Sequence, residues 1–332
     1  MPKSKKLLIR LSSAGDVILT SPLLKLMRKR DADIHFVVKS NYSDLVRYNP
    51  NISVLHLVQE HAGINQLERL RRQLIAEKFD ETLDLHNNFR TVYLRRGTAK
   101  KISVIKKDVL KRTALVNFKL NLFSEVRSAA LKYAQVYDKT LDQVPRPEIF
   151  YPPEMNERII QIWKQFESKG RKSVFLCPGS RHFTKRWPAQ NWNSLSKLLT
   201  AQQQVVLIGG TADVEVCRSI EEDSPVTNFA GRFTMLESAA ILSFADLVIT
   251  NDSFLMHAAN GLGKKVIAIL GSSVKEFGFF PYGVENKIIE VEGLDCRPCS
   301  HIGKESCPRK HFRCMLETTP EMVYRAAAEM LT

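Results

Sequence analysis

Short runs of apolar and β-branched residues alternate along the first half of the chain with segments of helical spacing. Five such runs predict strands, at Leu7–Leu11, Ile34–Val38, Val54–Val58, Glu81–Leu85 and Ile102–Ile105. Between them, apolar residues three and four positions apart predict helices with one buried face, at Asp16–Lys29 and Gln66–Glu77. Alternating strands and helices are typical of a parallel sheet covered by helices.

The alternation stops at a proline-rich stretch, Pro145–Pro147 and Tyr151–Glu154, and then begins again. The later strands are predicted at Ser173–Leu176, Val205–Ile208, Val226–Phe229, Leu247–Thr250 and Val266–Leu270. The later helices are predicted at Met155–Glu167, Ala189–Thr200, Ala212–Ile220, Met235–Phe244, Leu255–Gly261 and Pro320–Leu331. We therefore expect an α/β protein of two Rossmann-like, doubly wound domains that face a cleft, residues 1–150 and 151–332.

The composition of the 332 residues, 44% hydrophobic and 25% charged, is that of a globular protein. The N-terminus is basic, but the apolar run Leu7–Leu11 is too short for a signal sequence or a membrane span, which favours a cytoplasmic protein. No strand is followed by G-x-G-x-x-G and no Walker motif is present, which argues against a dinucleotide-dependent dehydrogenase and a P-loop enzyme.

The formal net charge of +14 is concentrated between Arg90 and Lys139, where thirteen basic residues face only three acidic ones. Within this region, Lys107–Phe123 mixes Leu, Val and Phe with Lys and Arg, as a basic amphipathic segment does. Such a surface suits an anionic partner, which could be a nucleic acid, an anionic membrane face or a phosphorylated substrate. A solvated face with no partner is the alternative.

Two strand-to-helix turns carry groups suited to phosphate. Phe175–Pro188 joins a strand, a Pro-Gly-Ser turn and Lys185 to the start of a helix, where free N–H groups and a lysine favour anions. Thr250–His257 repeats the arrangement with Asp252 and Ser253. The same fold would bring both turns together. The alternatives are an ordinary strand-helix connection and a packed, hydrogen-bonded His257.

Two further carboxylates are candidates for chemistry. The first strand runs into Ser12-Ser13-Ala14-Gly15-Asp16, so Asp16 either caps a helix or takes a proton from an acceptor hydroxyl. Glu237 either holds ribose hydroxyls or lies at the surface. A literal D-x-D, Asp31-Ala32-Asp33, precedes a strand and is interpreted as a turn.

Four of the six cysteines, Cys296, Cys299, Cys307 and Cys314, form a C-x2-C-x7-C-x6-C pattern. In a cytoplasmic chain this spacing does not indicate a disulfide framework. It suits either a structural zinc or reduced, packed thiols, although the second pair lacks a C-x2-C knuckle.

Several ordered motifs together resemble glycosyltransferase family 9, the bacterial ADP-heptose:lipopolysaccharide heptosyltransferases. They are LIRLSSAGDVILTSPLL, DLHNNFR, PGSRHFTKRWP, VVLIGG, NFAGRFTMLESAAIL, ADLVITNDSFLMHAAN and CRPC with CPRKHFRCM. The resemblance implies a GT-B fold and an inverting, metal-independent transfer of heptose from ADP-heptose to the lipopolysaccharide inner core. After the aspartate the family usually has Thr-Gly or Ser-Gly, whereas Phe254 replaces the glycine here.

The resemblance also implies roles for individual residues. Asp16 matches the general base, and Lys185 matches the lysine that balances the charge of the diphosphate. The nucleotide-sugar site is matched by Ser180, Glu237, Asp252, Ser253 and His257. The residues matched or expected at the acceptor are Ser12, Ser13, Arg90, Lys106, Lys107, Lys111 and Arg112.

The implied partner is an anionic glycolipid acceptor at the inner face of the cytoplasmic membrane, with the enzyme bound peripherally there and no nucleic acid involved. One alternative is a family 9 transferase of another sugar to core oligosaccharide or capsule. A second, of another class, is a non-catalytic basic protein that binds nucleic acid, although no aromatic-basic motif of that kind is present.

Overall fold

The computed structural model describes residues 3–332, so the first two residues of the predicted 1–150 domain lie outside it. The chain forms two compact units. The first contains the residues up to Lys107 together with Ala129–Tyr151, and the second contains Asp108–Ser128 together with Pro152–Thr332. The sequence prediction placed everything before residue 151 in one domain, whereas the structure groups Asp108–Ser128 with the second unit.

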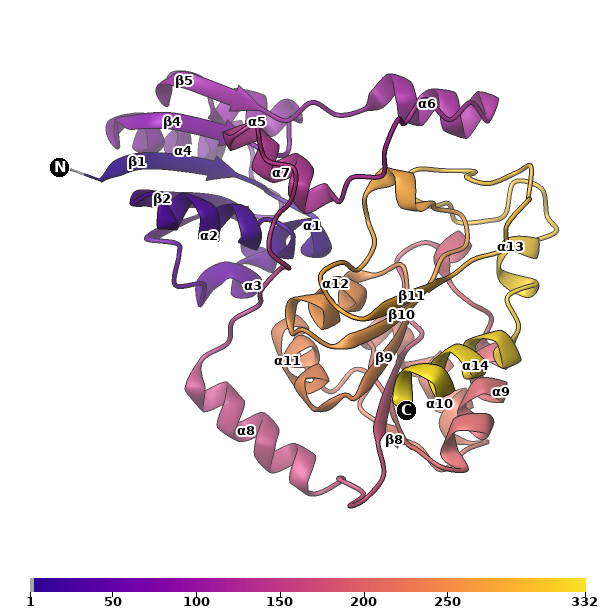
Figure 1. The fold of residues 1–332 in the computed structure, drawn as a ribbon. Coiled ribbons are helices and arrows are strands. Elements are labelled where there is room, and N and C mark those ends of the chain that lie inside the picture. The colour runs from indigo at the N-terminus through magenta and orange to yellow at the C-terminus, as the bar shows by residue number, and fades with distance from the viewer. Residues whose placement is uncertain (1–2) are drawn as a thin grey trace. The chain divides into compact units, whose positions relative to one another are not determined.

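The first unit is built on a five-stranded parallel sheet with the order β3-β2-β1-β4-β5. Its strands are β1 (Ser4–Ile9), β2 (Ala32–Lys39), β3 (Val54–Val58), β4 (Phe79–Asp84) and β5 (Ala99–Val104). Its helices are α1 (Ala14–Ile18), α2 (Ser21–Lys29), α3 (Asp44–Arg47), α4 (Ile64–Ala76), α5 (Phe89–Leu94) and α7 (Ala129–Tyr137). All five predicted strands are present, which confirms the parallel sheet (Figure 1).

The second unit is built on a six-stranded parallel sheet with the order β11-β10-β9-β6-β7-β8. Its strands are β6 (Ser173–Cys177), β7 (Gln204–Leu207), β8 (Thr227–Asn228), β9 (Leu247–Asn251), β10 (Lys265–Ile269) and β11 (Asn286–Ile289). Its helices are α6 (Val109–Phe118), α8 (Pro153–Lys164), α9 (Ala189–Thr200), α10 (Val214–Glu221), α11 (Met235–Ala240), α12 (Phe254–Gly261), α13 (Arg313–Leu316) and α14 (Pro320–Leu331). Short 3-10 turns join several of these elements.

One predicted helix is wrong in detail, because Asp16–Lys29 is two helices, α1 and α2. At the break, the Thr20 hydroxyl donates to the Val17 carbonyl and the Ser21 hydroxyl donates to the Ile18 carbonyl. Pro22 then occupies the first turn of α2, where its missing N–H costs nothing. The last strand, β11, was not predicted, because it begins with Asn286 and Lys287 and contains only two apolar residues, Ile288 and Ile289.

In each sheet the chain first adds strands on one side of its first strand and then crosses over to add strands on the other side. In the first unit this switch lies between β1 and β4, and in the second it lies between β6 and β9. The loops at the carboxyl ends of such neighbouring strands diverge to opposite faces and leave a crevice, where ligands of open α/β sheets bind. The polar motifs found in the sequence follow these four strands.

Buried apolar residues keep the carboxyl ends of these strands in place. Leu7, Ile9 and Leu11 of the first strand and its loop lie in the core of the first unit, together with Val37. In the second unit, Trp187 and Trp192 are buried on the sheet with their ring centroids 5.0 Å apart, edge to face. The segment after the phosphate-type turn is therefore anchored by large side chains on both sides of Pro188.

Candidate active site

The second unit holds a buried ion pair at its switch point. Lys185 Nζ lies 2.6 Å from Asp252 Oδ2, and the Ser273 hydroxyl donates to the same oxygen at 2.6 Å. Only 7% of Asp252 is exposed. Burial alone would raise the pKa of Asp252, but the charge and hydrogen bond of Lys185 outweigh it, helped by the bond from Ser273, and lower the pKa. Asp252 is therefore ionised, and it holds Lys185 beside the turn.

Hydrogen bonds join the two turns that the sequence predicts to be neighbours. Asn251 Nδ2 donates to the Pro178 carbonyl at 2.7 Å, and the Ser180 hydroxyl donates to the Asp252 carbonyl at 3.1 Å. Gly179 lies so close to Asp213 that a Cβ atom there would be 2.2 Å from the carboxylate. The prediction that Ser180, Lys185 and Asp252 lie together agrees with this geometry, and Gly179 is required by packing.

The helix after Asp252 presents its N-terminus at the same place. Ser253 is the N-cap of α12, and Thr250 Oγ1 lies 3.3 Å from its hydroxyl. His257 lies one turn further along α12, is 4% exposed and packs edge-on against the Phe279 ring. Phe254, in place of the family's glycine, is the first residue of the helix and is half-buried.

The cysteine-rich segment supports this site through an arginine. Arg297, within the C-R-P-C motif, donates to the carbonyls of Gly271 at 2.6 Å and Ser273 at 2.9 Å, and it pairs with Glu290 at 2.6 Å. Arg297 thereby fixes the loop that brings Ser273 to Asp252. All six cysteines are free thiols, and among residues 3–332 no three His, Cys, Asp or Glu side chains are arranged to hold a metal ion.

In the first unit, Asp16 lies at the switch point between β1 and β4, and four donors surround its carboxylate. Oδ1 accepts from Arg10 Nη2 at 2.7 Å and from the Tyr133 hydroxyl at 2.5 Å. Oδ2 accepts from the Ser13 hydroxyl at 2.7 Å and from the Ser13 backbone N–H at 3.1 Å. Asp16 thus makes the helix-capping contact that one reading of the sequence predicts.

These contacts change the proton affinity of Asp16. Burial alone would raise its pKa, but the Arg10 charge and the hydrogen bonds from Tyr133 and Ser13 lower it to about 2. Asp16 is 9% exposed and Tyr133 is 3% exposed, whereas Ser13 is exposed. The carboxylate is therefore ionised at neutral pH, and the side of Oδ2 is the one that opens toward solvent.

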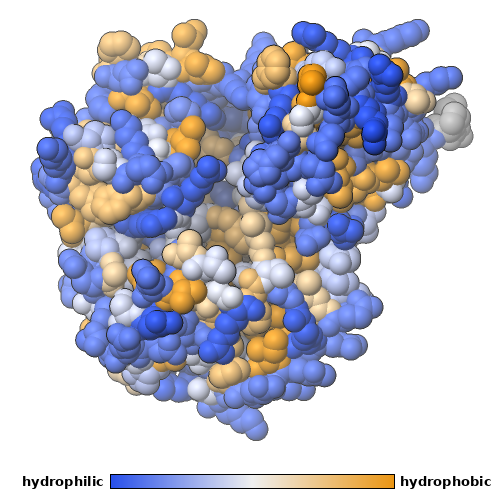
Figure 2. Space-filling view, turned by 180° about the vertical axis from the view of Figure 1, so that it is seen from behind, coloured by the Kyte–Doolittle hydropathy of each residue, from blue (hydrophilic) through white to orange (hydrophobic). Residues whose placement is uncertain are grey.

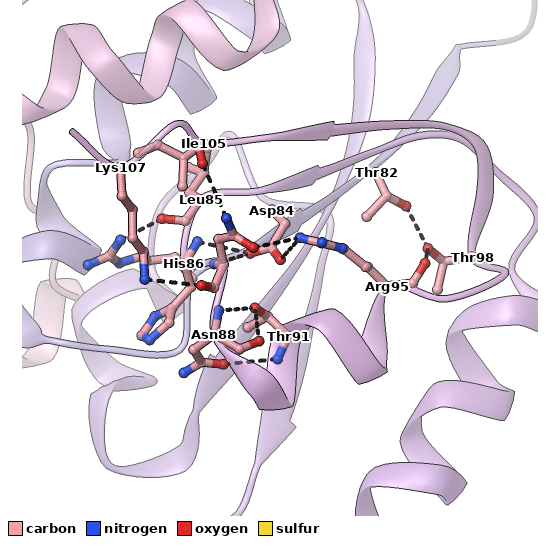
Figure 3. Close-up of polar contacts among 12 residues, drawn as sticks. Thr82, Asp84, Leu85, His86, Asn88, Thr91, Arg95, Thr98, Ile105 and Lys107 are labelled. Carbon is pink, nitrogen blue, oxygen red and sulfur yellow. Dashed lines mark hydrogen bonds and ion pairs between the residues drawn. The ribbon is translucent and has the colours of Figure 1, made fainter. Parts of the chain in front are cut away.

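A second network shapes the loop after β4 (Figure 3). Asp84 is fully buried, accepts from the backbone N–H groups of His86 and Asn87, and pairs with Arg95 at 2.6 Å. Burial, and then the charges of Arg10 and Lys107, lower the pKa of His86 to about 4, so its ring is neutral at pH 7. Arg10 also donates to the Leu85 carbonyl at 2.5 Å, which ties this loop to Asp16.

A pocket of about 310 Å³ opens beside these loops. It is lined by Leu11, Ser12, Lys39, Asn88, Phe89 and Arg90. Two of the seven predicted acceptor residues, Ser12 and Arg90, therefore share one pocket with a second cation, Lys39, and with Phe89, which is 83% exposed. A pocket with two cations and an apolar side chain suits an anion on an amphipathic molecule.

Other predicted residues lie elsewhere. Glu237 forms a capping box with Thr234 and pairs with Arg158 of α8, and no contact among the described residues joins it to Lys185. Arg112 is half-buried, with its Nε atom sealed from solvent. Asp31 of the D-x-D has a φ of 59°, in the left-handed region, as a turn residue does.

Sequence reasoning missed four residues that complete these sites, Arg10, Lys39, Tyr133 and Ser273. Arg10 is the one polar residue in the apolar run Leu7–Leu11, and Ser273 follows the predicted strand Val266–Leu270. A charge in a buried strand and a hydroxyl at its carboxyl end were signals that could have been used. Tyr133 comes from a helix 117 residues after Asp16, and the pattern carries no sign of that contact.

Comparison with known proteins decides the family. A sequence profile described as "Glycosyltransferase family 9 (heptosyltransferase)" matches residues 67–309, which is most of the chain. The chain belongs to glycosyltransferase family 9. It is thus an enzyme of the glycosyltransferase class, and the nucleic-acid-binding alternative is set aside.

Family 9 proteins of known name and structure match the chain over nearly its whole length. Lipooligosaccharide heptosyltransferase 2 of Campylobacter jejuni is 26% identical over 328 residues, which is 96% of this chain and 95% of that protein. The crystal structure of a family 9 glycosyltransferase from Veillonella parvula has a TM-score of 0.81 at 22% identity and covers 100% of this chain and 98% of that one. The Escherichia coli ADP-heptose lipopolysaccharide heptosyltransferase II has a TM-score of 0.74 at 20% identity, with 98% of each chain covered. The two Rossmann-like sheets are therefore those of a GT-B fold.

Proposed function

We propose that this family 9 enzyme transfers heptose from ADP-heptose to the lipopolysaccharide inner core, with Kdo-lipid A or a heptosylated core as acceptor. The observation that carries the proposal is the buried Lys185–Asp252 pair, which holds a cation at the switch point where a nucleotide would bind. The names of the relatives, a lipooligosaccharide heptosyltransferase and an ADP-heptose heptosyltransferase, support the choice of sugar.

In the proposed reaction, the acceptor oxygen bonds to C1 of the heptose from the face opposite the nucleotide. The bond between C1 and the β-phosphate oxygen breaks, and ADP leaves with the electron pair. Its growing charge is balanced by Lys185 and by the N–H groups at the start of α12, to which the side chain of the N-cap residue Ser253 makes no hydrogen bond. Ser180, Glu237 and His257 are proposed to contact the rest of the donor.

Asp16 receives the proton of the acceptor hydroxyl. Because Arg10 and buried Tyr133 occupy Oδ1, we assign the proton to Oδ2, where the acceptor hydroxyl takes the place of exposed Ser13. A carboxylate with a pKa of about 2 is a weak base. It therefore removes the proton late, once the forming C–O bond has made the hydroxyl strongly acidic.

The acceptor is proposed to bind the first unit through its negative charges. Lys39 and Arg90 in the 310 Å³ pocket suit the carboxylates or phosphates of an inner-core glycolipid. Lys106 and Lys107, both exposed, extend this basic region of the first unit. Lys111 and Arg112 lie in α6 of the second unit, and Arg112 is largely enclosed. Such an acceptor places the enzyme peripherally at the inner face of the cytoplasmic membrane.

Isothermal titration with ADP-heptose, ADP-glucose and UDP-glucose tests the donor. We expect ADP-heptose to bind at least about tenfold more tightly than either competitor. A sugar that fits its site should contribute more than about 1.4 kcal/mol of binding free energy, which corresponds to a factor of ten in affinity. Tighter binding of another sugar nucleotide would favour the alternative, a family 9 transferase of a different sugar.

A further inference from the structure

Large apolar side chains are exposed close together in and after α6. Leu110 is 84% exposed, Phe118 is 70%, Leu120 is 58% and Leu122 is 55%. We call these four residues the α6 apolar face. In Figure 2, orange apolar side chains gather at the upper left, where α6 lies.

The spacing places Leu110 and Phe118 on one side of the helix. Leu110, Ala114 and Phe118 are four residues apart, so they lie along one stripe, while Leu115 points away from it and is 7% exposed. The chain leaves α6 at Lys119, which has a φ of 58°, and continues through Leu120 and Leu122. The helix thus has one buried side and one open, apolar side.

The segment that follows α6 is fixed to the rest of the second unit. Lys119 Nζ donates to the carbonyls of Pro298 at 2.8 Å and Cys296 at 3.2 Å, and Asn121 Nδ2 donates to Glu276 at 3.4 Å. Lys119 Nζ also donates to the Val116 carbonyl at 2.7 Å, which closes the end of α6. The α6 apolar face is therefore held on a fixed support.

The charges around this face identify what covers it. Between Lys106 and Arg127 the chain has six basic residues and two acidic ones, and the whole protein carries +14. A second copy of the chain would bring like charges together, whereas an anionic lipid surface offers opposite charge and an apolar interior. Among residues 3–332 no helix is long and apolar enough to cross a membrane.

We propose that α6 lies in the surface of an anionic bilayer and inserts Leu110, Phe118, Leu120 and Leu122 among the lipid acyl chains. The proposal deepens the proposed function, on which it rests for the lipid-linked acceptor. It adds an apolar contact, made by the second unit, to the electrostatic contact of the basic region. Salt weakens the attraction between charges but does not weaken the insertion of apolar side chains, so binding at high salt separates the two contributions.

Sedimentation with vesicles of phosphatidylglycerol and phosphatidylcholine, without donor or acceptor, tests the insertion. We expect the variant Leu110→Ser, Phe118→Ser, Leu122→Ser to bind at least about tenfold more weakly than the wild type at 0.5 M salt, where charge attraction is largely screened. The matched control is Ile64→Ser, another exposed apolar residue (56% exposed), which should bind as the wild type does. Equal binding of the triple variant and the wild type would overturn the proposal.

A reporter tests insertion without removing the apolar face. All three native tryptophans, Trp163, Trp187 and Trp192, are at most 5% exposed, so a new one at the surface reports on its own surroundings. Fluorescence of Leu110→Trp should be quenched by vesicles with brominated acyl chains, and that of Ile64→Trp should not. No quenching at position 110 in bound protein would overturn insertion.

Two measurements keep this proposal separate from the proposed function. Thermal unfolding of the triple variant should match that of the wild type, and transfer to a de-acylated, water-soluble acceptor should be unchanged. If soluble transfer is absent in the wild type while vesicle binding follows the pattern above, only the proposed function fails. A concentration-dependent dimer that the triple variant abolishes, with no vesicle binding, would assign the face to a second copy and overturn the membrane proposal.

Discussion

At the residue scale, the account rests most heavily on Asp16. Replacing Asp16 with Asn keeps the size of the side chain and removes the proton acceptor. We expect turnover to fall by about 10²–10⁴-fold with the affinity for ADP-heptose nearly intact, because general bases contribute about this much. Single-turnover transfer and donor titration measure the two effects, and a variant that keeps more than about a tenth of wild-type turnover would show that Asp16 is no essential base.

Asp16 also links stability to pH. Its folded pKa of about 2 lies below its ordinary value of 3.8, so its contribution to the free energy of unfolding is present above about pH 4 and is lost as the pH falls through 2. The shift corresponds to about 2 kcal/mol. In urea unfolding, the difference in stability between the wild type and Asp16→Asn should therefore shrink between about pH 6 and pH 2.5, and a constant difference would contradict the assigned pKa.

Lys185 is expected to act on the diphosphate. Lys185→Ala should weaken the binding of ADP-heptose more than the binding of adenosine and should lower turnover, because the charge of the leaving group grows during the reaction. The variant also leaves Asp252 buried without its cation, so its unfolding temperature is a necessary control. Lys185→Arg keeps the charge and separates the two effects, and equal losses for adenosine and ADP would show that Lys185 does not contact the phosphates.

The sequence predicts the location of single residues well where a motif follows the end of a strand. Ser180, Lys185 and Asp252 lie together because β6 and β9 are neighbours, and parallel neighbours bring their carboxyl ends to one edge. Arg10 and Tyr133 escaped prediction because their role comes from tertiary contacts with a carboxylate, which no local pattern records. Glu237 was matched by family motif, and the structure gives it a capping contact, so its donor role stays a prediction.

At the scale of elements, the pocket between the loops after β1, β2 and β4 gives a prediction of its own. Lys39→Ala and Arg90→Ala should each raise the KM for the acceptor and leave the KM for the donor unchanged, because both cations line that pocket. The matched control is Lys100→Ala, which removes an exposed charge at the beginning of β5, the opposite edge of the sheet. An equal change in the control would show a general effect of charge and not a binding site.

The elements themselves were predictable where burial is complete. All ten predicted strands are present. Of these, β6, β7, β9 and β10 are almost fully buried and read as nearly continuous apolar runs, whereas β3, β5 and β8 are only partly buried. The observed helix boundaries differ from the predicted ones where side-chain hydroxyls take hydrogen bonds that the backbone would otherwise make. The Thr20 and Ser21 hydroxyls do so between α1 and α2. The helix α6 was foreseen as a basic amphipathic segment, but its membership in the second unit involves Lys119, whose contacts with Cys296 and Pro298 lie far along the chain.

At the scale of the whole molecule, catalysis is expected to need no added metal. Transfer should persist in EDTA, because Lys185 and the N-terminus of α12 can supply the positive charge that a divalent ion provides in other transferases. Rates with and without chelator, and after addition of Mg²⁺ or Mn²⁺, test this. Activity that is lost in EDTA and restored by either ion would contradict it, whereas unfolding in EDTA with rescue by Zn²⁺ would identify Cys296, Cys299, Cys307 and Cys314 as a structural site.

The most direct test of the central claim is the transfer itself. Purified protein is incubated with ADP-heptose and an inner-core acceptor, and the acceptor is weighed by mass spectrometry, with Asp16→Asn in parallel. The account predicts that the wild type adds one heptose and releases ADP, while the variant binds ADP-heptose but adds almost none within the same time. An acceptor left unmodified by folded wild-type protein, or one that gains a different sugar from a competing nucleotide in preference to heptose, would contradict it.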